Sequence, residues 1–112
     1  MIRITVYRCG STYTGISAKG HAAYAEEGSD IICAAASALL TNAVNSIECL
    51  AGDRIEDLES ESGLVACRFP EGLHEKGMLL MESLILGLKQ LEEIRGSEDE
   101  PYVRLLIEEE RS

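Results

Sequence analysis

"IRITVYRCGSTYTGISAKG", residues 2–20, contains two runs of alternating apolar and polar side chains on either side of a short turn. Alternation of this kind predicts a strand with one buried face, and residues 2–8 show it most clearly. "CGS" at residues 9–11 predicts the turn, and residues 13–20 predict a second, weaker strand. The stretch is therefore predicted to form a β-hairpin, and three side chains of its first strand should face a core: Ile2, Ile4 and Val6.

The residues that follow this hairpin predict a helix. Apolar side chains recur at spacings of three and four over residues 31–51, which is the pattern of an amphipathic helix. Ser29 or Asp30 is expected to cap its N-terminus, and Gly52 is expected to end it. The segment before the helix, about residues 22–30, is expected to be a flexible loop.

The second half of the chain repeats this order of hairpin and helix. The sequence predicts a hairpin over residues 54–69 with its turn at 61–63, an amphipathic helix over 73–94, and a last strand over 102–109. Two glycines within the second helix, Gly77 and Gly87, are expected to mark close helix packing. The order ββαββαβ predicts an α+β domain, in which two main helices pack on a mostly antiparallel sheet.

The composition fits one small domain with an aliphatic core. The chain has 112 residues, of which 46% are apolar and only 4% aromatic. This length allows one modest core, so residues 1–112 are predicted to form a single domain. The first ten residues lack the apolar region of a signal peptide, and no apolar run approaches the roughly 18 residues of a membrane span. A cytoplasmic protein with reduced cysteines and no membrane contact is therefore expected.

The net charge of −10 restricts the kind of partner that the protein can bind. A phosphate backbone would require clustered lysine and arginine, so direct binding to nucleic acid is not expected. An acidic surface attracts basic polypeptides over long range. The alternative interpretation is an acidic surface that does no more than keep the protein solvated.

His21 and Cys33 form a candidate catalytic pair. Cys33 would be the third helical residue if Asp30 caps the helix, and the positive end of a helix favours a thiolate over a thiol. The free backbone N–H groups there, including that of Cys33, could hold an oxyanion. The loop between the two residues can return the His21 imidazole to the thiol, and a cysteine with a histidine base is the minimum for acyl transfer. The alternative interpretation is a buried, unreactive cysteine.

Two neighbours of the pair allow more than one role. The Asp30 carboxylate can cap the helix or can orient the His21 imidazole, and it would raise the pKa of Cys33 if it lay near the sulfur. Ser37 lies one turn after Cys33 on the same helix face. It can donate a hydrogen bond near the site or back to a helix carbonyl.

The other cysteines and the second histidine are expected to be structural. Cys67 alternates with apolar neighbours and should be part of the core, and Cys9 and Cys49 are also expected to be structural. No Cys-x-x-Cys pair is present, so a zinc site is not expected. His74 is expected to be a solvated side chain at the start of the second helix.

The stretch "GHAAYAEEGSDIICAAASAL", residues 20–39, resembles the signature of the ribosomal-processing cysteine protease family called Prp. That signature is Gly-His-Ala, a short glycine-containing loop, then Gly-x-Asp, two aliphatic residues, a cysteine, small residues and a serine. Members often carry a further glycine in the loop, where Ala25 stands here. The chain length and the order of elements are similar as well. The matching positions are Gly20, His21, Ala22, Gly28, Asp30, Ile31, Ile32, Cys33, Ala34, Ala35 and Ser37.

The resemblance implies a cytoplasmic, homodimeric endopeptidase that needs no metal or organic cofactor. Members remove a short N-terminal extension from the twenty-seventh protein of the large ribosomal subunit, and they cut after an aromatic-rich apolar segment. Cys33 would be the nucleophile and His21 the general base. Gly20, Asp30 and Ser37 would support them, and the loop around Gly28 would move to admit substrate.

One rival function comes from a different class of protein. A dimeric module without catalytic activity could bind peptides or assist ribosome assembly with the same fold. Such a module has no need of a reactive thiol, so the titration of Cys33 would separate the two functions. An acylphosphatase-like enzyme is not expected, because no arginine-bearing phosphate loop precedes the first helix.

Overall fold

The computed structural model describes residues 1–20, 29–61 and 64–111. His21, Gly28 and most of the predicted loop at 22–30 lie outside the described residues. The order of elements is the predicted ββαββαβ, with a short π-helical turn after the first helix. The elements are β1 (Ile2–Cys9), β2 (Thr12–Lys19), α1 (Ser29–Ser46), η1 (Ile47–Ala51), β3 (Glu56–Glu61), β4 (Leu64–Arg68), α2 (Glu75–Glu92) and β5 (Val103–Glu109).

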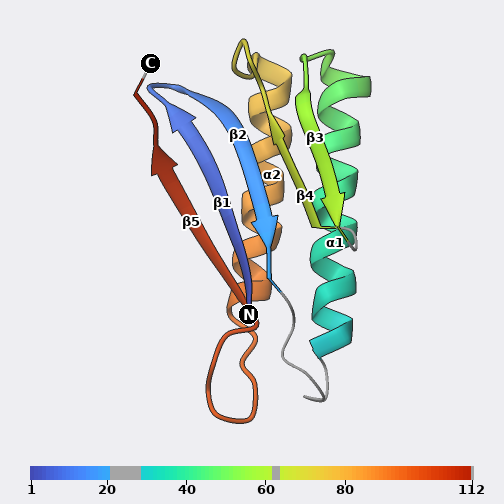
Figure 1. Cartoon of the computed structure of the whole chain (residues 1–112), viewed down its shortest axis with the longest axis vertical. Helices are drawn as coiled ribbons and strands as arrows, with labels where there is room; N and C mark the ends of the chain where they lie inside the picture. Colours follow the sequence, from blue (N-terminus) through green and yellow to red (C-terminus); the bar gives the residue numbers. More distant parts are fainter. Residues whose placement is uncertain (21–28, 62–63, 112) are drawn as a thin grey trace.

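The five strands form one sheet in the order β3-β4-β2-β1-β5. All neighbouring strands are antiparallel except β1 and β5, which pair in parallel with Ile2 opposite Val103. Both helices lie on one face of this sheet, and neither covers the other face (Figure 1). The predicted α+β class is confirmed, and β3 and β5 are the two edge strands.

The hairpin at the start of the chain is confirmed in detail. β1 and β2 pair from Arg3 opposite Lys19 to Cys9 opposite Thr12, with a bulge between Tyr7 and Arg8. The chain turns at Gly10, whose φ of 60° is the left-handed conformation that glycine adopts at least cost. The predicted core-facing side chains of β1 are all fully buried: Ile2, Ile4 and Val6.

The core is aliphatic, as the composition predicted, and lies between the sheet and the two helices. Among the residues that the structure describes, Phe69 is the largest fully buried side chain. Cys67 is 3% exposed and is part of the same cluster, so its predicted core position is confirmed. The helices contribute long aliphatic side chains to this cluster: Leu40, Ile47, Met81 and Leu88.

The ends of the helices follow from local backbone chemistry. The first helix closes with the π-helical turn η1, and Gly52 ends it with φ 75° and an N–H that donates to the Ile47 carbonyl. This ending was predicted. α2 begins at Glu75, two residues later than predicted, because His74 is extended with φ −83° and ψ −177°.

The two glycines of α2 have different neighbours. A Cβ on Gly87 would lie 3.2 Å from Leu39 of α1, so this glycine does mark close helix packing, as predicted. A Cβ on Gly77 would instead lie 2.0 Å from the Asp53 carboxylate, so the prediction of helix packing was wrong there. Gly77 is needed because a buried acidic side chain occupies the space beside it.

The first helix with its π-helical turn, Asp30–Ala51, is 22 residues long and apolar enough to cross a membrane by length and composition alone. Core helices of soluble proteins meet the same criterion. In this structure Ile32, Ala36 and Leu40 of the helix pack in the core against the sheet. Absence of membrane contact remains a prediction.

Candidate functional site

Cys33, the predicted nucleophile, lies near the start of α1. It is the fifth residue of that helix, because α1 begins at Ser29. Its side chain is half-buried and packs against the edge of the hydrophobic core. The thiol is therefore held by a rigid element, and it is not enclosed by the core.

The position of Cys33 within the helix differs from the prediction. Asp30 is not the residue before the helix but lies in its first turn, and Cys33 is two positions further from the end than expected. A fifth helical residue donates its N–H to the carbonyl four residues earlier, so this N–H already has a helical acceptor. The free donors of the first turn belong to Ser29, Asp30 and Ile31. Because the effect of the helix dipole falls off within the first turn, it acts more weakly on Cys33 than predicted.

Gly20 directly follows β2 and precedes His21, and its conformation is one that only glycine tolerates. Its φ is +111°, and a Cβ there would lie 2.3 Å from the carbonyl oxygen of Met1. The end of β2 thus runs directly against the start of β1. The end of β2 and the start of α1 lie at the same end of the molecule (Figure 1). His21 itself lies outside the described residues, so its contact with Cys33 remains a prediction.

Two supporting residues of the predicted site, Asp30 and Ser37, lie in the first three turns of α1. Asp30 is exposed, and a carboxylate in the first turn of a helix interacts favourably with the helix dipole. Ser37 is half-buried one turn after Cys33. Catalytic roles for both residues remain predictions, and Gly28 lies outside the described part of the chain.

The remaining cysteines differ in their environment. All four cysteines are free thiols, and Cys49 is exposed while Cys9 is half-buried. Burial raises the pKa of Cys67 to about 11, and the nearby Arg68 guanidinium opposes this shift. Cys67 is therefore a thiol at neutral pH and a poor nucleophile. Among the residues that the structure describes, no three histidine, cysteine or acidic side chains lie close enough to hold a metal ion.

A buried carboxylate at the start of α2 was not predicted from the sequence. Asp53 is 4% exposed, and its Oδ1 accepts hydrogen bonds from the His74 backbone N–H at 3.2 Å and from the His74 ring Nδ1 at 2.6 Å. This contact raises the pKa of His74, through the hydrogen bond first and then through the negative charge. The His74 side chain is exposed, as predicted, but its ring is held by the hydrogen bond to the Asp53 carboxylate.

Asp53 and His74 resemble the orienting half of a catalytic triad, but they serve the fold. They lie at the start of α2, at the opposite end of the molecule from Gly20 and the start of α1 (Figure 1). The carboxylate satisfies a donor at the helix N-terminus, which is a capping role. The one signal in the sequence was Gly77, a glycine early in an amphipathic helix, where a close neighbour is the usual reason.

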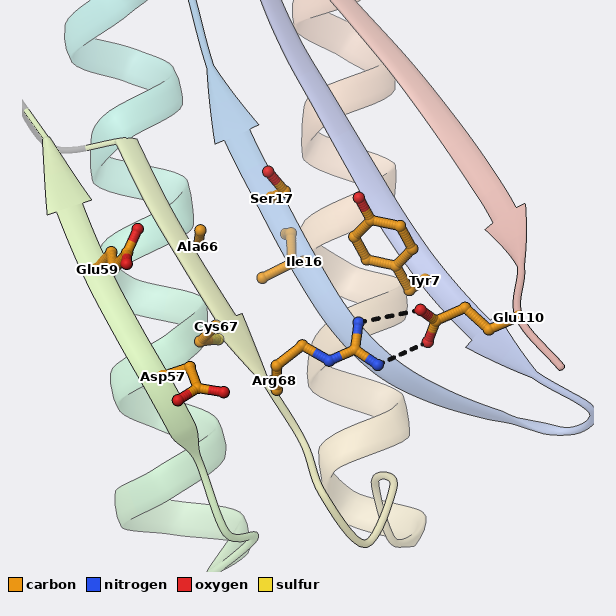
Figure 2. A pocket seen from close by; sticks show the side chains of 9 residues that line it. All are labelled: Tyr7, Ile16, Ser17, Asp57, Glu59, Ala66, Cys67, Arg68 and Glu110. Atoms are coloured by element: carbon orange, nitrogen blue, oxygen red, sulfur yellow. Dashed lines mark hydrogen bonds and ion pairs between the residues drawn. The ribbon is translucent and has the colours of Figure 1, made fainter. Parts of the chain in front are cut away.

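A shallow hollow of about 380 Å³ lies on the face of the sheet that the helices leave uncovered (Figure 2). Arg68 of β4 makes two hydrogen bonds to Glu110, at 2.8 and 3.1 Å, and stacks over the Tyr7 ring. The ion pair lowers the pKa of Glu110, with help from a hydrogen bond donated by Thr14, and raises that of Arg68. Asp57 and Glu59 of β3 lie on the other side of the hollow (Figure 2).

This hollow is not the predicted catalytic site. It is lined by side chains of β1 to β4 and of the residue after β5, and neither Cys33 nor Gly20 is among them. Its one cation is already paired with a carboxylate, and the thiol beside it has a raised pKa. The arrangement fixes strands to one another and offers no nucleophile.

Comparison with known proteins gives the same family as the sequence motif. The sequence profile described as "Cysteine protease Prp" matches residues 1–98. The chain is 37% identical over 78 residues to the ribosomal processing cysteine protease Prp of Bacillus subtilis, covering 65% of this chain and 70% of the relative. It is 31% identical over 81 residues to the protein of that name from Staphylococcus aureus, covering 71% and 76%.

Solved structures share the fold over almost the whole chain. A crystal structure of a Streptococcus mutans protein aligns with a TM-score of 0.75 and 30% identity, covering 98% of this chain and 96% of that one. A Staphylococcus aureus Prp in complex with a covalently linked product peptide aligns with a TM-score of 0.74 and 26% identity, covering 96% and 100%. The same enzyme with a substrate peptide aligns with a TM-score of 0.72 and 25% identity, covering 96% and 100%.

Proposed function

Because the chain belongs to the Prp family of ribosomal processing cysteine proteases, we propose that it removes the N-terminal extension of one ribosomal protein. The substrate is the twenty-seventh protein of the large subunit. The enzyme cuts it after an aromatic-rich apolar segment, and ribosome maturation needs this cleavage. The family supplies the reaction class, and the resemblance of residues 20–39 to its signature supplies the substrate.

In this proposal Cys33 attacks the carbonyl carbon of the scissile peptide bond, and His21 takes the thiol proton. The tetrahedral intermediate collapses to a thioester as His21 returns that proton to the leaving amine. A water molecule, deprotonated by His21, then hydrolyses the thioester and frees Cys33. Free N–H groups in the first turn of α1 are the nearest oxyanion donors on the helix.

The observation that carries the proposal is the product peptide covalently linked to the Staphylococcus aureus Prp. A covalent link to peptide is what a nucleophilic mechanism forms. The half-buried Cys33 at the start of α1 is the residue that matches the cysteine of the family signature. The other described cysteines lie in β1, η1 and β4.

The setting of the reaction is part of the same proposal. The protein acts in the cytoplasm as a homodimer, binds its ribosomal substrate directly, and makes no direct contact with nucleic acid or membrane. It needs no cofactor, since a cysteine and a histidine suffice for acyl transfer. The loop at residues 22–30 moves to admit the substrate.

Mass spectrometry of a mixture tests the proposal directly. The wild-type protein is incubated with a ribosomal protein precursor that carries an apolar, phenylalanine-containing N-terminal extension. We expect a single cut after the aromatic segment with the wild type and with Cys49→Ala, and an intact precursor with Cys33→Ala or His21→Ala. Full cleavage by Cys33→Ala would exclude this nucleophile. An intact precursor in every sample would favour a peptide-binding role.

A further inference from the structure

β5, the edge strand at the C-terminal end of the chain, has an exposed outer edge with an unusual side-chain order. Arg104, Leu106 and Glu108 alternate on the uncovered face of the sheet, because they pair with Arg3, Thr5 and Tyr7 of β1. Leu106 is 55% exposed and Ile107 is 46% exposed. Long apolar edge strands are places where another chain can pair.

The hydrogen-bonding groups of this edge are also identifiable. The Leu105 N–H points away from β1, since it donates to the Glu92 carboxylate at 2.8 Å. In a parallel pair the N–H and C=O groups of one residue point to the same side of the strand, and those of the next residue point to the opposite side. The backbone groups of Leu105 and Ile107 therefore face outward, while those of Leu106 face β1.

We propose that β5 is an isologous dimer interface, where two copies pair antiparallel about a two-fold axis at Leu106. This register places Arg104 opposite Glu108 of the partner subunit, and Glu108 opposite the partner's Arg104. Leu105 lies opposite the partner's Ile107, and these two residues exchange two backbone hydrogen bonds. The outward-facing groups of each copy thus meet those of the other, and the two sheets join into one.

Neighbouring registers lack this complementarity. An axis at Leu105 places Arg104 opposite the partner's Leu106, and an axis at Ile107 places Glu108 opposite the partner's Leu106. Opposite charges directly across a strand pair stabilise it, and a charge against an aliphatic side chain does not. Neither Arg104 nor Glu108 makes an ion pair with another residue in the described ranges, so both are available to a partner.

A groove lies beside β5 on the helix side of the sheet. It has a volume of about 280 Å³ and is lined by Tyr13, Glu82, Ile85, Leu86, Lys89 and Ile107. Paired residues point to the same face of a sheet, so the two-fold axis is perpendicular to it and both α2 helices lie on one side of the joined sheet. They then run antiparallel across the seam.

The charges of this groove also pair across the two-fold axis. Glu82 and Lys89 are equally spaced on either side of the Ile85–Leu86 pair, so an axis at the level of that pair places each acid opposite the partner's lysine. Leu86, which is 64% exposed, then packs on the apolar residues of the other copy. The strand and the helix thus each have a charge pattern that is self-complementary about a two-fold axis.

Glu92 opposes this pairing in the single chain. Its carboxylate occupies the Leu105 N–H, which the dimer needs, and so protects the edge until a second copy displaces it. Glu92→Ala should therefore tighten the dimer. This interface rests on the homodimer of the proposed function and names the surface that forms it, while the pairing itself does not depend on proteolysis.

Sedimentation velocity from 1 to 100 µM tests the interface with the full chain and needs no substrate. Arg104→Glu and Glu108→Arg should each weaken the dimer about tenfold or more, since each converts two attractive pairs into two repulsive ones. The double variant Arg104→Glu/Glu108→Arg should return to within about threefold of the wild type, because the pair is restored with its charges exchanged. Lys76→Glu, which lowers the net charge by the same amount as Arg104→Glu but lies in the first turn of α2, should have no effect.

Two results would overturn the interface. One is a wild type that remains monomeric at the highest concentration. The other is a dimer that neither single charge reversal weakens, which would place the interface on another surface. Circular dichroism of each variant checks that these exposed substitutions leave the fold intact. Since peptide cleavage is measured separately, a failed interface leaves the proposed reaction standing.

Discussion

At the scale of single residues, Gly20 shows how the position of a candidate catalytic segment is fixed by backbone sterics. The matching family signature begins with this glycine. The structure gives the reason, because φ is +111° and the Met1 carbonyl occupies the space of a side chain. Any other residue would push the end of β2 away from the start of β1.

Replacement of Gly20 by alanine should lower the free energy of unfolding by about 2 kcal/mol or more, from the positive φ and the steric clash together. Gly10→Ala is the matched control, since Gly10 has φ +60° but nothing within 4 Å of a Cβ. Its cost should be about 1 kcal/mol. Urea denaturation measures both, and equal losses for the two variants would show that the contact with Met1 does not matter.

The cysteines provide a second test at this scale. Cys67 should resist alkylation in the folded protein, since it is 3% exposed and its pKa is raised to about 11. The exposed Cys49 should react at neutral pH. Peptide mapping after iodoacetamide treatment distinguishes them, and denaturant should make both reactive. Modification of Cys67 at the rate of Cys49 without denaturant would contradict the packing described for β4.

At the scale of elements, local patterns predicted almost every helix and strand. Alternation and helical spacing are set by neighbouring residues, so the hairpins, both helices and the ending at Gly52 were found within one or two positions. Contacts between segments that are distant in the sequence were not predicted. The parallel pairing of β1 with β5, the burial of Asp53 and the Arg68–Glu110 pair join residues that no local pattern connects.

The candidate site was predictable to a similar extent. Residue types and spacing identified Cys33 and His21, and the helix that carries Cys33 was also predicted. The first turn of that helix was misplaced, because Ser29 and Asp30 favour both a cap and a helical position. The number of residues between the helix start and Cys33 depends on which of these two positions is adopted. The prediction that the Cys33 N–H is a free oxyanion donor depends on it as well.

The contact of Asp53 with His74 at the start of α2 should make stability depend on pH. The raised pKa of His74 means that folding favours the protonated imidazole. Its contribution is therefore complete below the unfolded pKa of about 6.5, and it is lost as the pH rises through the higher folded value. Urea denaturation of the wild type and of His74→Gln should differ more at pH 5 than at pH 9. An equal difference at both would contradict the ion pair.

At the scale of the whole molecule, charge is the property that bears on substrate encounter. The net charge is −10, and ribosomal proteins are basic, so long-range attraction should speed association. Salt screens such attraction, with a Debye length of about 8 Å at physiological ionic strength. The rate constant for cleavage at low substrate concentration should therefore fall as sodium chloride is raised from 20 to 500 mM.

A neutral peptide with the same cleavage segment is the control for this experiment, and its cleavage should change little with salt. If both substrates respond equally, salt acts on the enzyme itself and not on the encounter. If neither responds, the acidic surface serves solvation alone.

The parallel pairing of β1 with β5 has a consequence for how the chain reaches its fold during synthesis. β1 leaves the ribosome about a hundred residues before β5, the strand that pairs with its outer side. Until β5 is made, β1 pairs with β2 on one side only, and the backbone groups of its other edge have no strand partner. Such late closure delays cooperative folding and exposes backbone to aggregation. A chain truncated before Val103 should therefore stay bound to chaperones, while the chain that includes β5 is released.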